Sequence, residues 1–144
     1  MEFDFPNSQV TVTWPEPTDG IWELVTDDST LAAGDEIVIA ATGYNYAISE
    51  TQKSNNRGQA SITKVSEPPS ITFAGDAGVC SFILGGTTGA WTFYDEVNEG
   101  YLYAASSSEN YLRTQATNNA NGEWTIAISN NVATVTSIGD YTRN

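Results

Sequence analysis

The sequence predicts an all-β fold, built as a barrel or β-trefoil-like domain, with a β-sandwich as the alternative. Short stretches alternate β-branched or aromatic residues with polar ones, as in Val10–Trp14, where two valines and a tryptophan share one face. Clusters of Gly, Pro, Asn and Asp separate these stretches at intervals of roughly 8 to 12 residues. Together, the alternation and the regular breakers indicate about a dozen short strands.

The expected strands follow one another closely along the chain. They span residues 10–14, 22–25, 36–41, 46–49, 60–65, 70–73, 80–84, 91–94, 101–104, 111–114, 124–129 and 133–137. Among the breakers, Asn121-Gly122 has the composition of a tight turn, because both residue types adopt a positive φ at little cost. A helical turn is expected only over Asp28–Gly34, with Ser29 or Thr30 as its cap.

A weak repeat places a tryptophan at the start of three strands, in Gly20-Ile21-Trp22, Gly89-Ala90-Trp91 and Gly122-Glu123-Trp124. One supersecondary unit used several times, each beginning with a Trp that enters the core, would produce this pattern. The repeat favours a trefoil or a related barrel over a sandwich. It also predicts that all three tryptophans face inward.

The chain divides into residues 1–19, an N-terminal strand that is either a linker or an added edge strand, and residues 20–144, the all-β domain. The last stretch, Gly139–Asn144, has the composition of a turn that would lead into a further element. The domain is therefore expected either to close near Ile138 or to have been cut from a longer protein.

Composition argues against several classes of function. Asp and Glu number 18 against 5 Lys and Arg, so the formal charge is −13, which disfavours contact with nucleic-acid phosphates. No apolar run approaches the roughly 20 residues that span a bilayer, and any secretion signal would lie outside this sequence. Because the chain has no His, it lacks the residue on which His-based nucleophilic triads and most catalytic zinc sites depend.

Cys80 is the only cysteine, so an internal disulfide is impossible. It lies in the apolar stretch Val79–Leu84, where a cysteine acts as a small hydrophobic residue in a buried strand. A reactive thiol is the less favoured alternative, because no His or other base stands beside it.

Carboxylates leave two further kinds of site open. Asp95 with Glu99, or Asp27 with Asp35, could face each other across a cleft as glycoside hydrolysis requires. The oxygen-rich loops Thr26–Ser29 and Asp95–Glu99 could accept Ca²⁺, although they lack the ordered spacing of a dedicated calcium loop. Solvated surface charge is favoured in both cases, so no catalysis, metal or other cofactor is expected.

Aromatic and polar side chains crowd together in the second half of the chain. The candidate ligand-binding residues are Trp91, Tyr101, Tyr103, Tyr111, Arg113 and Asn118. Sugar rings stack on exposed aromatic rings while Asn and Arg bond their hydroxyls, and the same mixture suits contacts with another protein. For Trp91, packing in the core is favoured over contact with a ligand. For each tyrosine, core packing and ligand contact are equally expected. Tyr44 and Tyr46 form a second, weaker cluster.

Several motifs occur in a characteristic order. They are Trp22–Asp27, Leu31–Ala40, Gln52–Arg57, Gly100–Ser108, Asn110–Thr114 and Trp124–Ile126. Over about residues 20–144 the chain thereby resembles a β-rich accessory domain that recurs in secreted and surface proteins of Bacteroidetes. The resemblance implies an extracytoplasmic accessory module and brings no ligand or functional residue with it. In such domains, sequence like Thr142–Asn144 leads into further strands. This sequence stops there, so Val10–Trp14 would have to take the position of a missing strand.

Within these motifs, Asn55-Asn56-Arg57 is expected to anchor its loop, with Asn satisfying turn backbone and Arg bridging carbonyls. For the whole chain we expect a non-catalytic extracellular or cell-surface binding module, with a glycan as the preferred ligand class. A structural spacer or protein-interaction domain is the alternative, and a glycoside hydrolase-like enzyme ranks third. The expected partner is a glycan or another protein, without nucleic acid and without a membrane span.

Overall fold

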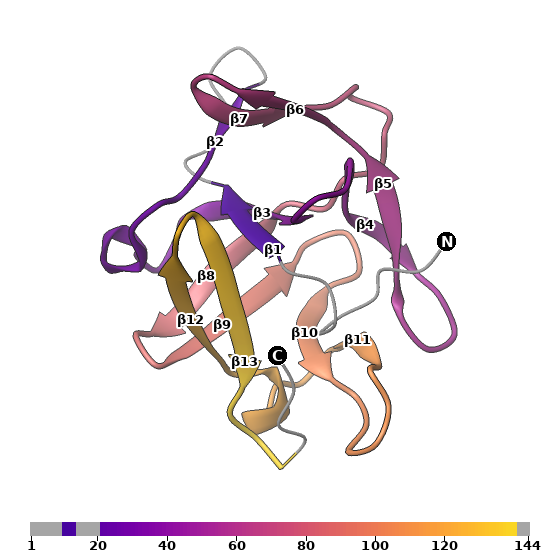
Figure 1. Cartoon of the computed structure of the whole chain (residues 1–144). Coiled ribbons are helices and arrows are strands. Elements are labelled where there is room, and N and C mark those ends of the chain that lie inside the picture. Colours follow the sequence, from indigo (N-terminus) through magenta and orange to yellow (C-terminus); the bar gives the residue numbers. More distant parts are fainter. Residues whose placement is uncertain (1–9, 14–20, 141–144) are drawn as a thin grey trace.

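The computed structural model describes residues 10–13 and 21–140, and its all-β architecture confirms the predicted class. The chain there forms a ten-stranded sheet and a three-stranded sheet (Figure 1). The strands are β1 (Val10–Thr13), β2 (Trp22–Glu23), β3 (Glu36–Ala41), β4 (Tyr46–Gln52), β5 (Arg57–Ser61), β6 (Thr63–Ser66), β7 (Pro69–Thr72), β8 (Phe82–Thr87), β9 (Ala90–Asp95), β10 (Gly100–Ala104), β11 (Leu112–Gln115), β12 (Trp124–Ser129) and β13 (Val132–Ser137), and the 3₁₀ helices are η1 (Asp28–Thr30) and η2 (Ala120–Gly122). No helix in the described ranges is long and apolar enough to cross a membrane.

The large sheet curls into a nearly closed barrel. Its strands follow the order β11-β10-β9-β12-β13-β1-β3-β4-β5, and β8 pairs with both β3 and β9, two strands that lie far apart in that order. This cross-link bends the sheet back on itself and leaves β5 and β11 as its two ends. The expected N-terminal strand, β1, pairs with β13 and β3 and so lies inside the sheet instead of at an edge.

Aromatic rings fill the main core of the barrel. Phe93 lies with its ring centroid 6.1 Å from that of Phe82 and 6.1 Å from that of Trp124. The Trp124 indole is fully buried, and its Nε1 donates a hydrogen bond to the Leu102 carbonyl at 3.1 Å. A buried indole N–H requires such a partner, because leaving it unpaired away from water costs free energy.

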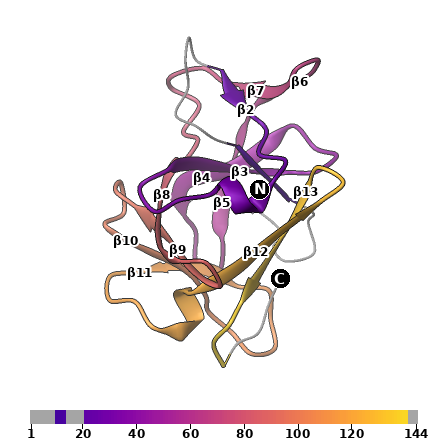
Figure 2. The ribbon, with the colours of Figure 1, turned by 90° about the vertical axis from the view of Figure 1, so that its left-hand side faces the viewer.

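The three-stranded sheet, ordered β2-β7-β6, lies at the opposite end of the molecule from β11 (Figures 1 and 2). It builds a second apolar cluster against the outer side of β3. Ile37 and Ile39 pack in the main core, whereas Val38 and Ala40 pack in the second cluster with Trp22. Because β3 is covered on both faces, it reads as a continuous apolar run, as strands buried on both sides do.

The three repeated tryptophans are all buried, as predicted, at 5%, 5% and 0% exposure for Trp22, Trp91 and Trp124. Their positions in the fold are not equivalent. Trp22 belongs to the small sheet and the second cluster, while Trp91 and Trp124 pair with each other in the large sheet. The repeat therefore marks burial, and it does not mark three copies of one structural unit.

Two local predictions were wrong. The stretch 60–65, expected as one strand, divides at Ile62 into the end of β5 and the start of β6, which belong to different sheets. The tight turn expected at Asn121-Gly122 is instead the helix η2, where a Cβ on Gly122 would lie 1.9 Å from the Oδ1 atom of Asn118 and would displace that side chain. The tight turn sits between β12 and β13, at residues 130–131, as a pair of asparagines with φ of 51° and 64°.

The helical turn predicted over residues 28–34 exists as η1, but its cap differs from the prediction. Asp27, and neither Ser29 nor Thr30, provides the capping side chain. Its Oδ1 accepts hydrogen bonds from the Ser29 hydroxyl at 2.7 Å and the Ser29 backbone N–H at 2.9 Å. These two bonds hold the pKa of the Asp27 carboxyl below its usual 3.8, because they favour the ionised form.

Residues 1–9, 14–20 and 141–144 lie outside the described part of the chain. The expectations for the Trp14 end of the first strand and for Thr142–Asn144 fall there.

Candidate functional site

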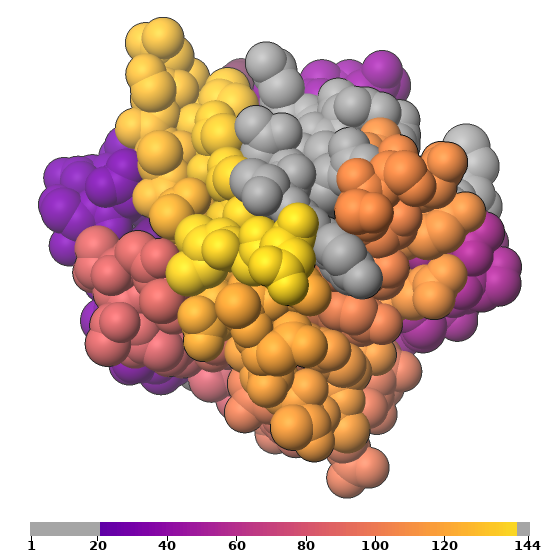
Figure 3. Space-filling view, turned by 90° about the horizontal axis from the view of Figure 1, so that it is seen from below, coloured from indigo at the N-terminus to yellow at the C-terminus, as the bar shows by residue number. Residues whose placement is uncertain are grey.

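Half-buried tyrosines gather on the outer side of β9, β10 and β11. Along β9 and β10, Tyr94, Tyr101 and Tyr103 alternate with buried residues such as Phe93 and Leu102, so their rings point away from the core. The strands and loops from β10 to η2, orange in Figure 3, form a continuous stretch of the surface. We call Tyr94, Tyr101, Tyr103, Tyr111 and Arg113 the tyrosine face.

Strand register places these side chains next to one another. Tyr101 pairs with Tyr94 on one side and with Gln115 on the other, and Tyr103 pairs with Arg113. The Tyr94 and Tyr101 rings meet edge to face, with centroids 5.1 Å apart and planes at 69°. This is a favoured geometry for two aromatic rings. The result is two neighbouring rows of aromatic and polar side chains across three strands.

Arg113 is held in place from two sides. Its guanidinium carbon lies 5.1 Å from the centroid of the Tyr111 ring, which is a cation–π contact. Its Nη2 donates to the Asn55 side-chain oxygen at 2.9 Å, and its Nε faces the Asn55 carbonyl at 3.4 Å. A guanidinium has more N–H donors than these contacts use, so Arg113 presents fixed donors beside two tyrosine rings.

Two of the predicted site residues do not belong to this face. Trp91 is 5% exposed and packs in the main core, so it cannot stack on a ligand at the surface. Asn118 braces the segment between β11 and η2: its Oδ1 accepts from Gln115 Nε2 at 3.2 Å, and its Nδ2 donates to the Gly122 carbonyl at 3.3 Å. Tyr94 was missing from the predicted set. Its position three residues after Trp91 on one strand already places the two side chains on opposite faces.

The second predicted aromatic cluster is a stacked pair at the turn from β3 to β4. The rings of Tyr44 and Tyr46 are 5.5 Å apart, and Tyr44 is 58% exposed. Tyr46 packs against the main core.

The motif Asn55-Asn56-Arg57 joins the two ends of the large sheet, a set of contacts that we call the seam. Asn56 Oδ1 accepts from the Leu112 N–H at 2.7 Å, and Arg57 Nη1 donates to the Thr114 hydroxyl at 2.9 Å. The Asn55–Arg113 bonds lie in the same seam. The motif anchors its loop as predicted, but its partners differ from the prediction: Asn56 bonds the backbone of β11 and not that of its own turn, and Arg57 bonds a hydroxyl as well as a carbonyl. The anchoring reaches from the start of β5 to β11, the strand that carries part of the tyrosine face.

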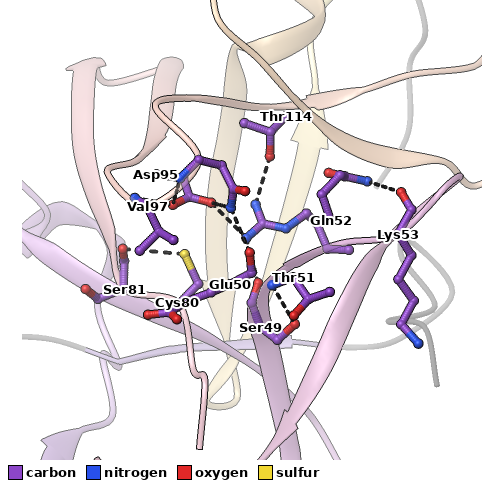
Figure 4. A network of polar contacts seen from close by, with 12 residues as sticks. Ser49, Glu50, Thr51, Gln52, Lys53, Cys80, Ser81, Asp95, Val97 and Thr114 are labelled. Carbon is purple, nitrogen blue, oxygen red and sulfur yellow. Dashed lines mark hydrogen bonds and ion pairs between the residues drawn. The ribbon is translucent and has the colours of Figure 1, made fainter. Parts of the chain in front are cut away.

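A buried ion pair lies at the centre of the seam (Figure 4). Arg57 Nη2 and Asp95 Oδ2 are 2.8 Å apart, and neither side chain is exposed. Arg57 Nη2 also donates to the Ser49 carbonyl at 2.6 Å, and its guanidinium carbon lies 5.6 Å from the centroid of the Phe82 ring. These contacts connect β4, β5 and β9 through one guanidinium.

Asp95 is saturated with donors. Its Oδ1 accepts from the backbone N–H groups of Val97 at 2.9 Å and Asn98 at 3.1 Å, and its Oδ2 accepts from Asn98 Nδ2 at 2.7 Å as well as from Arg57. A carboxylate held in this way is not available as a hydrolytic acid or nucleophile, so the predicted pairing of Asp95 with Glu99 does not describe an active site.

Cys80 lies beside this ion pair and is buried, as predicted. Burial, with a smaller contribution from the charge of Asp95, raises the pKa of Cys80 to about 12. Because the thiolate is the reactive form, the thiol is inert in the folded chain.

The other acidic candidates also have structural roles. Asp27 caps η1, the Asp28 carboxylate accepts from the Ile128 N–H at 2.8 Å, and the Asp35 carboxylate accepts from the Ala32 N–H at 2.9 Å. In the part of the chain that the structure describes, no cluster of three or more Asp, Glu, Cys or His side chains is placed to hold a metal ion.

The tyrosine face is therefore the arrangement best suited to contact a partner. Register and the seam fix its side chains, and the structure adds Tyr94 to it while removing Trp91 and Asn118. The chain matches no family model, no curated protein sequence and no solved structure.

Proposed function

We propose that this chain is a non-catalytic binding module that contacts a glycan through the tyrosine face. The observation that carries the proposal is Arg113, stacked on Tyr111, tied to Asn55 and paired in register with Tyr103. Aromatic rings offer flat apolar surfaces to the C–H faces of a sugar, while the guanidinium donates to its hydroxyl groups. Because the seam already orders Arg113, little conformational entropy of that side chain is lost when a ligand binds.

The absence of catalysis is part of the proposal, and the acidic side chains support it. Asp95 is buried against Arg57, and Asp27 and Asp35 are bonded to backbone N–H groups. Neither predicted carboxylate pair is thus free for general acid and base chemistry. The resemblance of residues 20–144 to accessory domains of secreted and surface proteins further supports an extracellular or cell-surface setting.

A glycan array probed with the full chain tests the proposal. Binding to at least one oligosaccharide is expected, and Tyr103→Ala should weaken it at least about fivefold, which is about 1 kcal/mol, the usual threshold for an important aromatic contact. Tyr103→Phe keeps the ring and should bind nearly as well. Tyr44→Ala is the matched control, because Tyr44 is an exposed tyrosine outside the tyrosine face.

Blank wells beside a working positive control would end the glycan proposal and favour the protein-interaction alternative. Binding that survives Tyr103→Ala but is lost in Tyr44→Ala would place the site on the β3–β4 turn instead.

A further inference from the structure

A pocket between the small sheet and the end of β3 shares no residue with the tyrosine face. It encloses about 120 Å³, and Leu24, Val65, Pro69 and Ile71 supply apolar walls. Three residues whose side chains can hydrogen-bond, Thr42, Lys64 and Ser70, line the same space, and the Ser70 hydroxyl already donates to the Pro68 carbonyl at 3.0 Å. The small sheet and β11 lie at opposite ends of the molecule in Figures 1 and 2, so this pocket is separate from the proposed glycan site.

Lys64 occupies a position where the fold calls for an apolar residue. Across the small sheet it pairs with Ile71, which pairs in turn with Trp22, and both of these partners are buried in the second cluster. Directly opposed residues of neighbouring strands point to the same face, so Lys64 shares the inward side. Its Nζ donates to the Ala41 carbonyl, and burial lowers the pKa of Lys64 because desolvation disfavours the ammonium form.

Among the described residues, no carboxylate forms an ion pair with the Lys64 ammonium. The ion pair in that part of the chain joins Arg57 to Asp95. The ammonium carries three N–H donors, more than the Ala41 carbonyl uses. Thr42 contributes no second donor to the pocket, because its Oγ1 is buried and has no surface open to this space. A half-buried ammonium with spare N–H donors and no counter-charge, set in a largely apolar pocket, favours a ligand that supplies an acceptor and an apolar chain.

We propose that this pocket binds a small carboxylate with a short apolar chain of about four to six carbon atoms, because an apolar cavity of roughly 150 Å³ accommodates a ligand the size of benzene. The carboxylate accepts from Lys64 Nζ. The apolar chain lies against Leu24, Val65 and Ile71.

The chain's formal charge of −13 opposes the approach of any anion at long range. At physiological ionic strength, however, charges beyond about 8 Å are largely screened. The Lys64 ammonium lines the pocket itself, so it dominates the local interaction with a bound carboxylate.

The test is an NMR titration of the isotope-labelled full chain with sodium pentanoate and, separately, with pentanamide. Saturable shifts are expected at the amides of Thr42, Lys64, Val65 and Ile71. The amide should bind about tenfold more weakly or worse, because it lacks the charge-assisted bond to the ammonium. Lys64→Met keeps the aliphatic stem and should show the same loss, whereas Lys53→Met, which changes an exposed lysine elsewhere, should bind pentanoate like the original chain.

Three results would overturn the proposal. They are the absence of saturable shifts up to about 20 mM pentanoate, equal affinity for the acid and the amide, and undiminished binding by Lys64→Met. The acid–amide comparison uses the unmodified chain, so it remains decisive even if Lys64→Met does not fold.

Discussion

The buried ion pair of the seam offers the sharpest test of how the barrel is closed. Asp95→Asn removes the charge that balances Arg57 while keeping nearly the same side-chain size. Because both side chains are completely buried and 2.8 Å apart, the variant leaves Arg57 as an unpaired charge in the interior. Removing one partner of a buried pair costs about 3–5 kcal/mol, a large part of the stability of an ordinary domain.

The geometry adds a second cost. The two oxygens of Asp95 accept from three N–H groups of Val97 and Asn98, besides Arg57. An asparagine has one acceptor oxygen in place of two, so at least one of these bonds is lost or replaced by a contact between donors. A lost hydrogen bond of this kind is worth about 1 kcal/mol. We therefore expect Asp95→Asn to lower the free energy of unfolding by at least about 3 kcal/mol.

Urea unfolding, followed by the fluorescence of the buried tryptophans, measures this change. The exposed substitution Asp76→Asn is the matched control and should alter stability by no more than about 0.5 kcal/mol. Combining Asp95→Asn with Arg57→Met should cost clearly less than the sum of the two single changes, because the second removes the charge that the first leaves unpaired. A loss below about 1 kcal/mol for Asp95→Asn, or strict additivity in the double variant, would refute this account of the seam.

Two further outcomes follow from the fold. With its pKa raised from 9.0 to about 12, Cys80 should react with a thiol reagent in the folded chain roughly a thousandfold more slowly than an ordinary thiol, and at a normal rate in urea; rapid labelling under native conditions would contradict its burial. At the last hairpin, Asn131 has a φ of 64°, so Asn131→Ala should lower stability by about 1 kcal/mol while Asn131→Gly should be tolerated. Equal thermal midpoints for these two variants would show that the turn is built differently.

Most of the fold could be predicted because each strand is marked by alternating apolar and polar residues that are close neighbours in the sequence. The alternation around Trp91 and Phe93, for example, is enough to identify β9 and its inward face. The boundary between β5 and β6 could not be predicted in this way. Residues 59–63 alternate polar and apolar side chains across that boundary, and only packing against the second cluster makes the chain leave one sheet for the other at Ile62.

The candidate site could be predicted in part. Tyr101, Tyr103, Tyr111 and Arg113 were visible as a cluster because they are close in the sequence and the β10–β11 hairpin keeps them close in space. The hydrogen-bond partner of Arg113 could not be predicted from the sequence. Asn55 lies 58 residues away along the chain and comes into contact with Arg113 only when the barrel closes.

Long-range closure also explains why Arg57 was not expected in the interior. It follows a polar loop, which is typical of a surface arginine, and its partner Asp95 belongs to a strand on the other side of the seam. Pairwise burial of this kind leaves no periodic signal in a single sequence.

The most direct test of the central claim is a chemical-shift map of the labelled chain in the presence of an oligosaccharide that it binds on the array. The largest shifts should fall at Tyr94, Tyr101, Tyr103 and Arg113, and they should disappear in Tyr103→Ala. Shifts concentrated on the β3–β4 turn or on the small sheet, with the tyrosine face unchanged, would contradict the claim.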